Sequence, residues 1–467
     1  MLRYTGHPFV DVGIAVMESL LRPKECHAFT RKDLKFAADW LIRIYERKDL
    51  RGYLTVHFPN SGWCNPTIKE AKKEEYIKKV LFSYDAPPLE PERSCAFCSN
   101  KAQLLADRQH IPLLTGATVL VTAPGGVAGL PVCGYCLMAV QFYPLGTKKV
   151  DGRPLFWWTV EPELTFALVS NTFGEFRQSL AVTEDKVINF KWPYTRLMED
   201  ARRVLEEYDL MGEDKPLADC IGYHVTNYGS EPDFEQYHIP KELLEFWRDL
   251  KFAPEAVRLV HSQIEKKSWE AEKEKGGGKK QKAKQGNQSG EHIVSRRNFY
   301  YEALGRAFKE RDWKKEVRNI VTRFYLNTEQ ENLHLNNFQL CEMFLQRVGG
   351  MEKQRLDIIR DISDRIIEVL VLGNNDVRWL NDLYNREMLP QEFLRYLVRV
   401  QKELSRFGKP ISYDSILLMF DMASEDDANI KDAYLIRSLM LIRMFERVVK
   451  EKQDLLEKMS DSESDGR

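Results

Sequence analysis

The chain has 467 residues, 43% of them hydrophobic, so it can bury cores for about three domains of ordinary size. Its 69 Lys and Arg residues nearly balance 70 Asp and Glu residues, which excludes attraction to nucleic acid through global charge and leaves only local basic patches. No stretch approaches the roughly 20 apolar residues that span a bilayer, and eight cysteines are too few for a disulfide scaffold, so we expect a soluble, cytoplasmic protein without membrane contact.

The N-terminal segment, MLRYTGHPFVDVGIAVMESLLRPK, is predicted to belong to the folded protein. Its apolar run has the length of a signal peptide, but Asp11 interrupts it and a basic leader and cleavage site are missing. Short strand-like runs, helical segments and Pro/Gly turns then alternate up to about residue 265. This pattern predicts an α+β N-terminal region, residues 1–265.

A first candidate nucleic-acid surface lies in GYLTVHFPNSGWCNPTIKEAKKEE. We expect a strand through Phe58, a loop from Pro59 to Pro66, and a helix that opens with Thr67 and Glu70 in capping-box spacing. A helix start of this kind directs free backbone N–H groups at a phosphate. The side chains expected to reach base edges are Asn60, Ser61 and Asn65, and those expected to neutralise phosphates are Lys69, Lys72 and Lys73. The alternative is an ordinary turn over Trp63 with a solvated basic face.

Four cysteines form two Cys-x-x-Cys pairs, Cys95 with Cys98 and Cys133 with Cys136, separated by 34 residues. Two such turns complete the four-sulfur shell of a closed Zn²⁺ site, and we expect one structural zinc in a module of about residues 90–140. A thioredoxin-like redox pair would use only one of the two motifs, and disulfides are disfavoured in the cytosol. Four thiolates leave no open position for water, so the ion is not expected to carry out hydrolysis.

Two further segments offer contacts to nucleic acid. Asn227 and Tyr228 lie in a predicted turn between two strand-like runs, where turn chemistry alone also explains them. Phe156, Trp157 and Trp158 are candidates for stacking on bases, although consecutive aromatic residues in a strand are more often core.

Residues 266–292 are predicted to be a flexible loop or linker. Residues 265–284 hold eight Lys, four Glu and a Gly triplet, a composition that cannot bury apolar surface. After Ile293 the pattern becomes helical, and Leu356, Ile359, Ile362, Ile366, Val369 and Leu370 recur on one helical face. Residues 293–459 therefore read as an all-α bundle, followed by a disordered acidic tail at 460–467.

Within this predicted bundle, QEFLRYLVRVQKELSRFGK carries a basic ridge. Arg395, Arg399, Lys402 and Arg406 share one face of the expected helix, opposite an apolar stripe of Phe393, Leu397, Val400 and Leu404. Such a ridge can follow a phosphate backbone, although exposed basic faces are common on soluble helices.

Taken together, the start YTGHPFVDVGIAVM, the two cysteine pairs, the segment NYGSEPDFEQYHIP and the helical C-terminus resemble the type I-B CRISPR-associated CXXC-CXXC family, the large subunit of the Cascade surveillance complex. The resemblance implies a non-catalytic subunit that contacts the 5′ end of the CRISPR RNA, recognises the protospacer-adjacent motif in target double-stranded DNA and helps form the R-loop. The implied partners are the backbone, 5′-handle and small subunits of Cascade and a recruited helicase-nuclease or, in a transposon setting, a transposition adaptor.

Two questions stay open at the level of sequence. No phosphate-binding loop, metalloprotease helix or nucleophile elbow is found, which agrees with a binding subunit, but a zinc-supported nucleic-acid-processing enzyme with an unrecognised active site is the alternative. The resemblance also makes the segment from about Met351 small-subunit-like, with Met351 or Met343 as a candidate internal start.

Overall fold

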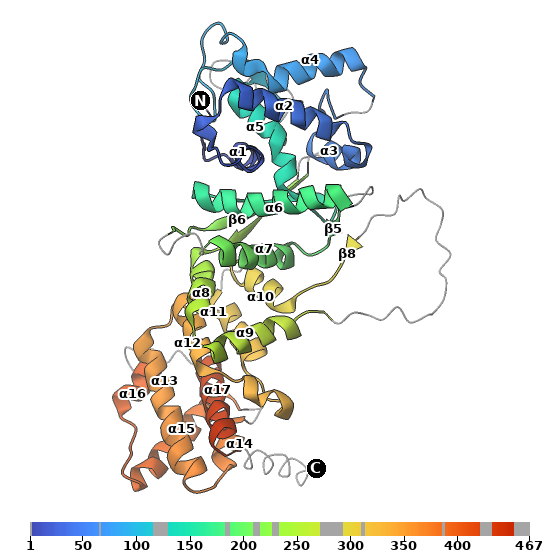
Figure 1. Cartoon of the computed structure of the whole chain (residues 1–467). Helices are drawn as coiled ribbons and strands as arrows, with labels where there is room; N and C mark the ends of the chain where they lie inside the picture. Colours follow the sequence, from blue (N-terminus) through green and yellow to red (C-terminus); the bar gives the residue numbers. More distant parts are fainter. Residues whose placement is uncertain are drawn as a thin grey trace, which may run out of the picture. The chain divides into compact units, whose positions relative to one another are not determined.

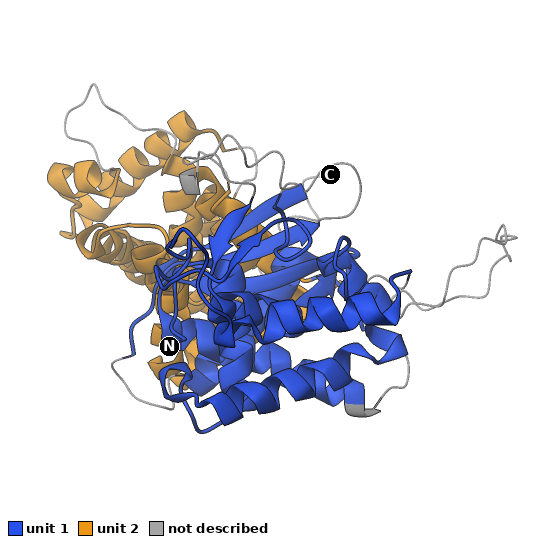
Figure 2. Cartoon of the chain, turned by 90° about the horizontal axis from the view of Figure 1, so that it is seen from above, with its two compact units in different colours: residues 1–241, 271–297 blue, residues 242–270, 298–467 orange. Residues whose placement is uncertain are grey.

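The computed structural model describes residues 2–64, 67–114, 129–182, 187–208, 215–226, 233–270, 293–309, 313–384, 388–420 and 432–452. The chain forms two compact units, residues 1–241 with 271–297 (unit 1) and residues 242–270 with 298–467 (unit 2), coloured separately in Figure 2. Most of the predicted linker and the whole acidic tail lie outside the described residues. Among the described helices, none has the length and hydrophobicity needed to cross a bilayer.

The boundary between the units differs from the predicted one at residue 265. Helices α8 (Lys241–Phe252) and α9 (Glu255–Lys267) pack with the C-terminal helices. The rings of Phe246 and Phe344 lie 5.4 Å apart, and Arg347 forms an ion pair with Asp249. These contacts join residues about a hundred positions apart, so local sequence patterns do not reveal them.

Unit 1 combines helices with a small sheet, as the α+β prediction requires, and helix predominates (Figure 1). Its helices are α1 (Pro8–Leu20), α2 (Arg31–Tyr45), α3 (Arg51–His57), α4 (Glu70–Leu81), α5 (Gly134–Phe142), α6 (Pro162–Val182) and α7 (Pro193–Tyr208). Its strands are β1 (Leu104–Ala106), β2 (Leu130–Val132), β3 (Lys148–Val150), β4 (Arg153–Thr159), β5 (Asn189–Phe190), β6 (Cys220–Thr226), β7 (Asp233–Ile239) and β8 (Ile293–Val294).

The main sheet of unit 1 has six strands in the order β7-β6-β4-β3-β5-β8. Strands β7, β6, β4 and β3 are antiparallel neighbours, whereas β5 pairs in parallel with both β3 and β8. Helix α7 covers one face, where Leu197 lies over Gly222. Helix α1 packs on the other face, where Phe9 meets Phe156 of β4 with 5.5 Å between ring centroids.

Helix α1 forms the centre of the unit 1 core, and residues Phe9 to Glu18 are all buried. Gly13 allows α1 to approach α5 closely, since a Cβ atom there would lie only 1.8 Å from the carbonyl oxygen of Ala139. The N-terminal apolar run is therefore a central core helix, in agreement with its assignment to the folded protein.

The prediction of a strand through Phe58 is wrong, because residues 51–57 form helix α3. Its buried residues are Tyr53, Leu54 and His57, which follow helical spacing rather than the alternation of a strand. The next helix, α4, begins at Glu70 after Lys69 as N-cap, with no side-chain cap, so the predicted capping box from Thr67 is not formed.

Unit 2 is helical in its described residues, apart from an isolated bridge between Trp269 and Asn298. Besides α8 and α9 it contains α10 (Phe299–Ala307), α11 (Trp313–Ile320), α12 (Phe338–Arg347), α13 (Lys353–Arg365), α14 (Arg378–Tyr384), α15 (Pro390–Arg406), α16 (Tyr413–Met419) and α17 (Ala433–Glu451). A π-helical segment, η9 (Ile366–Leu372), continues α13.

The predicted apolar face of residues 356–370 is largely confirmed. Leu356, Ile359, Ile362 and Ile366 are fully buried along α13 and the start of η9. Leu370 in η9 is also fully buried, whereas Val369 is only partly buried, and Ile367, which the pattern does not include, is buried as well.

Candidate metal centre and nucleic-acid surfaces

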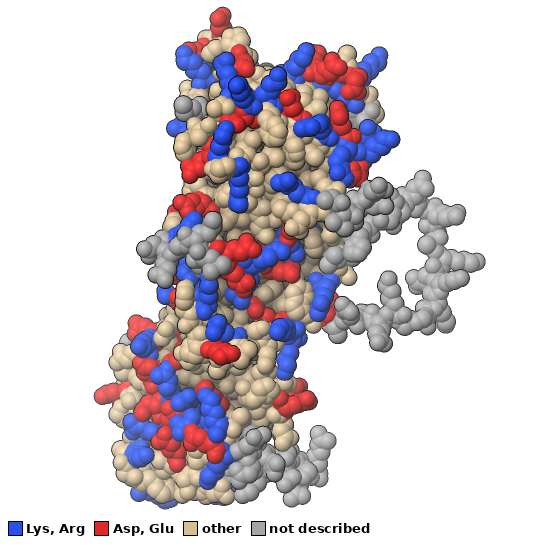
Figure 3. Space-filling model, viewed as in Figure 1, with Lys and Arg blue, Asp and Glu red and all other residues tan. Residues whose placement is uncertain are grey.

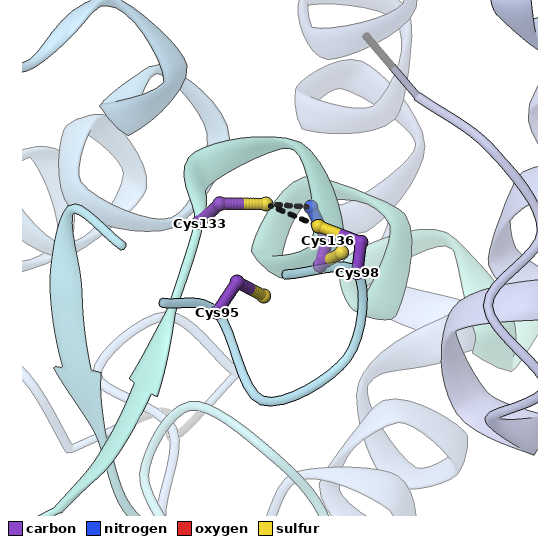
Figure 4. A group of neighbouring side chains, drawn as sticks. All are labelled: Cys95, Cys98, Cys133 and Cys136. Atoms are coloured by element: carbon purple, nitrogen blue, oxygen red, sulfur yellow. Dashed lines mark hydrogen bonds between the residues drawn. The ribbon is translucent and has the colours of Figure 1, made fainter. Parts of the chain in front are cut away.

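The four predicted metal ligands come from two tight backbone turns in unit 1. In the first, Ser99 adopts a left-handed backbone (φ 63°) and donates its N–H to the carbonyl of Cys95 at 3.0 Å. In the second, strand β2 ends at Val132, and the next residue, Cys133, caps α5 because its Sγ accepts the N–H of Cys136 at 3.4 Å (Figure 4).

A short two-stranded sheet brings the two turns together. Strands β1 and β2 pair in antiparallel fashion with Leu104 opposite Val132. Two backbone bonds extend the pairing toward the cysteines: Ala96 N–H donates to Pro131 at 2.9 Å, and Gln103 N–H donates to Val132 at 3.0 Å. The 34 residues between the pairs therefore do not prevent a shared site.

The geometry fits one metal ion. Cys95, Cys98, Cys133 and Cys136 are all buried, and their ligand atoms lie within 4.8 Å of one another. The sulfur atoms of Cys98 and Cys133 are 3.4 Å apart, close to the edge of about 3.8 Å of a tetrahedron with zinc–sulfur bonds of about 2.3 Å. All eight cysteines are free thiols, so the disulfide alternative finds no support.

The electrostatics of the four-cysteine cluster also favour a bound cation. Hydrogen bonds with Cys133 and Cys136 lower the pKa of Cys95, and they lower the pKa of Cys98 to about 7. The hydrogen bond with Cys133, followed by those with Cys95 and Cys98, raises the pKa of Cys136 above its usual range. Four thiolates this close repel one another, so full ionisation requires a positive ion between them.

Gly134, inside the second Cys-x-x-Cys pair, sets how closely α5 approaches its neighbour. A Cβ atom there would lie 2.1 Å from the backbone nitrogen of Tyr84 and 2.4 Å from the carbonyl carbon of Ser83. Only glycine fits this contact without displacing backbone. The packing of Gly134 thus supports the position of both Cys133 and Cys136.

The N-terminal segment contacts the first cysteine turn. The Arg3 guanidinium donates to the carbonyl of Cys98, and the ring of His7 packs on Phe97 with 4.4 Å between centroids. A metal bound at the four cysteines would therefore also stabilise the start of the chain.

Asp11 is an organising residue that sequence reasoning did not assign. Its buried carboxylate accepts hydrogen bonds from Thr5 N–H at 2.7 Å, Gly6 N–H at 3.0 Å and the indole of Trp158 at 3.1 Å. Burial raises its pKa, and the hydrogen bonds oppose that shift. The available signal was a single acidic residue inside an apolar helix, which has to find partners when buried.

The first predicted nucleic-acid loop is only partly available at the surface. Asn60 and Lys69 are exposed, as is Lys72, and Asn65 lies outside the described residues. Ser61 is 1% exposed, and its Oγ accepts the backbone N–H groups of Trp63 at 3.0 Å and Cys64 at 3.3 Å. The prediction that Ser61 reaches base edges is therefore wrong, because the loop uses its hydroxyl internally.

Lys73 is also less available than predicted, since it forms an ion pair with Glu70 at 3.2 Å on the same helix. The packing of Trp63 beneath the turn agrees with the alternative reading of this segment.

The two strand-like runs on either side of the second predicted turn are β6 and β7, which pair in antiparallel fashion. Asn227 and Tyr228 themselves lie outside the described residues. Phe156 and Trp157 are each 2% exposed, which places both in the core rather than at a stacking surface.

The predicted basic ridge lies on α15. Arg395, Arg399, Lys402 and Arg406 are exposed, whereas Phe393, Leu397, Val400 and Leu404 are buried on the opposite face. Acidic neighbours reduce its charge, because Arg399 pairs with Asp382 at 3.0 Å and Arg406 with Glu403 at 2.8 Å. Arg395 and Lys402 are the ridge cations that form no such ion pair among the described residues.

No protein-family model, curated protein or solved structure gives a significant match to the chain.

Proposed function

We propose that this chain is the non-catalytic large subunit of an RNA-guided type I-B CRISPR surveillance complex. In this role it contacts the 5′ end of the CRISPR RNA, recognises the protospacer-adjacent motif in duplex DNA and helps form the R-loop before a helicase-nuclease is recruited. The observation that carries the proposal is the four-cysteine cluster, because the most specific motif of the resemblance is also a site that can hold a metal ion.

We further propose that the ion is one Zn²⁺. Four thiolates in tetrahedral arrangement are typical of structural zinc, which supplies folding energy to its module. Since Cys95, Cys98, Cys133 and Cys136 would fill all four positions, no position remains for a reactive water. This arrangement supports a structural role, in which the ion joins the two cysteine turns and so stabilises the N-terminal segment that contacts the first of them.

The α15 ridge supports nucleic-acid binding as a second, weaker argument. Arg395 and Lys402 lie exposed on one helical face and can neutralise phosphates of the guide–target duplex or of the displaced strand. Their spacing follows the helix rather than a base sequence, so they are expected to bind backbone and to contribute no sequence preference.

Co-expression with the products of neighbouring genes tests the proposal. We expect a short RNA to co-purify, and we expect the complex to bind duplex DNA with an affinity that falls steeply as salt rises. Partners without RNA would contradict the proposal. Turnover of DNA or RNA by the purified chain would favour the zinc-supported enzyme instead.

A further inference from the structure

Helix α2 presents an exposed face on which an aromatic ring lies among cations. Lys32, Phe36, Trp40 and Arg43 follow helical steps of four, four and three residues and share this face. Lys32 and Arg43 are exposed, Phe36 is 52% exposed, and Trp40 is partly buried. The half-exposed ring of Phe36 and the two basic side chains can therefore be reached by one ligand.

Helix α6 extends this face. Trp40 meets Phe173 of α6 edge to face, with 6.0 Å between ring centroids, and the Arg177 guanidinium lies 5.8 Å above the ring of Phe173. Near the ends of the two helices, the Arg47 guanidinium donates to the carbonyl of Leu180 at 3.3 Å. These contacts fix α2 against α6, so the aromatic and basic groups are held in place before any ligand binds.

In the described part of the chain, the cations of this α2–α6 face are not held in ion pairs. Among the described residues, Lys32, Arg43 and Arg177 have no carboxylate partner, and Arg43 bonds only to the carbonyl of Asp39 on its own helix. Asp39 in α2 and Glu46 just after it are exposed acids on the same side of the helix as Lys32 and Arg43, and Asp39 is rotated from Lys32 by about 20° and from Arg43 by about 40° around the helix axis. Figure 3 shows mainly tan and blue surface, with little red, between α2 and α6.

We propose that the α2–α6 face binds single-stranded nucleic acid, with backbone phosphates on Lys32, Arg43 and Arg177 and an unpaired base stacked on Phe36. Free cations around an exposed ring are the arrangement with which proteins hold single strands without sequence preference. The face adds a binding surface to the proposed function and depends on that function only for the source of the strand, the guide RNA or the displaced DNA strand.

The test uses the full-length chain and fluorescein-labelled oligothymidylate and oligouridylate of about 20 nucleotides, followed by fluorescence anisotropy. Phe36→Ala is expected to weaken binding by roughly tenfold, and Phe36→Trp is expected to restore it. The matched control is Phe252→Ala, which removes another phenylalanine that is 69% exposed, in unit 2, and is expected to leave affinity unchanged. Both positions are at the surface, so the three variants should fold.

A second measurement, the salt dependence of the affinity, tests the phosphate contacts. The double variant Lys32→Ala, Arg43→Ala is expected to reduce the slope of log affinity against log salt by about 1.4, at about 0.7 for each contact with a single strand. Tighter binding of the RNA or the DNA oligonucleotide would identify which strand uses the face.

The outcomes separate this inference from the proposed function. The inference is wrong if the wild-type chain binds the oligonucleotides, the Phe36 variants bind with the same affinity, and the double variant keeps the wild-type salt slope. Other surfaces such as the α15 ridge would then hold the nucleic acid. If the wild-type chain binds neither oligonucleotide, the inference is also wrong, and RNA co-purification with the partners then judges the proposed function independently.

Discussion

Replacement of Gly134 by alanine should weaken metal binding without touching a ligand. The new Cβ atom would lie 2.1 Å from the backbone nitrogen of Tyr84, whereas ordinary contact begins at 3.4 Å, so the start of α5 and the Ser83–Tyr84 backbone must separate by more than an ångström. Because metal–ligand distances tolerate only about 0.2 Å, this shift disturbs the positions of Cys133 and Cys136. We expect overpacking to lower the free energy of unfolding by about 1–3 kcal/mol and metal affinity to fall by about 10- to 100-fold.

Two measurements check this expectation: the rate of zinc release to a chromogenic chelator, and urea denaturation of the metal-loaded protein. The matched control is Gly52→Ala in α3, where a Cβ atom would find open space. Since alanine is the better helix former, this variant should be as stable as the parent or more stable by roughly 0.5–1 kcal/mol. Wild-type chelator resistance and an unchanged urea midpoint for Gly134→Ala would refute the role assigned to this contact.

Three further predictions concern the metal centre and the core. Cys95→Ser should abolish the single bound zinc measured by elemental analysis, whereas Cys64→Ser should leave it in place, and equal zinc content in the two variants would contradict the assignment of ligands. His57 is buried and its pKa is lowered by burial to about 3, whereas an unfolded histidine takes up a proton near pH 6.5. Between pH 6.5 and 5 the unfolded state therefore binds more protons, and acidification should lower the free energy of unfolding by roughly 1 kcal/mol per pH unit. Denaturation of His57→Gln at each pH checks this, and a pH dependence as steep as that of the parent would contradict it. Metal removal should speed hydrogen exchange of the Thr5 and Gly6 amides, which donate to Asp11, and unchanged exchange at these amides would show that the metal does not stabilise the start of the chain.

Features that depend on local periodicity could be predicted from the sequence. The buried and basic faces of α15 follow from helical spacing alone, and the metal ligands follow from two short turns that each aim two thiolates at a common centre. Both depend on residues a few positions apart, so no knowledge of the tertiary fold is required.

Features that depend on distant contacts could not be predicted. In α3, the β-branched residues Thr55 and Val56 resemble a strand, but the burial of Tyr53, Leu54 and His57 against the rest of unit 1 favours a helix. Likewise α8 and α9 join unit 2 through contacts with α12, which no local pattern reveals.

The site shows the same division. The exposure of Lys72 follows from its position on α4. The burial of Ser61 does not follow from the sequence pattern, because its hydroxyl accepts backbone N–H groups from within the same loop. The cations of α2 are visible in the sequence, whereas the position of Arg177 beside them depends on how α2 packs against α6.

The N-terminal TGHPFVD segment and the two cysteine turns form one assembly in unit 1. Arg3 and His7 contact the first cysteine turn, while Asp11 binds Thr5 and Gly6 on one side and Trp158 of β4 on the other. The TGHPFVD segment thus bridges the metal module and the main sheet, and α1 continues it into the core beside α5, the helix that carries Cys136. A metal at the four cysteines would stabilise α5 and the N-terminal segment together, because α5 carries Cys136 and Arg3 and His7 contact the turn that carries Cys95 and Cys98.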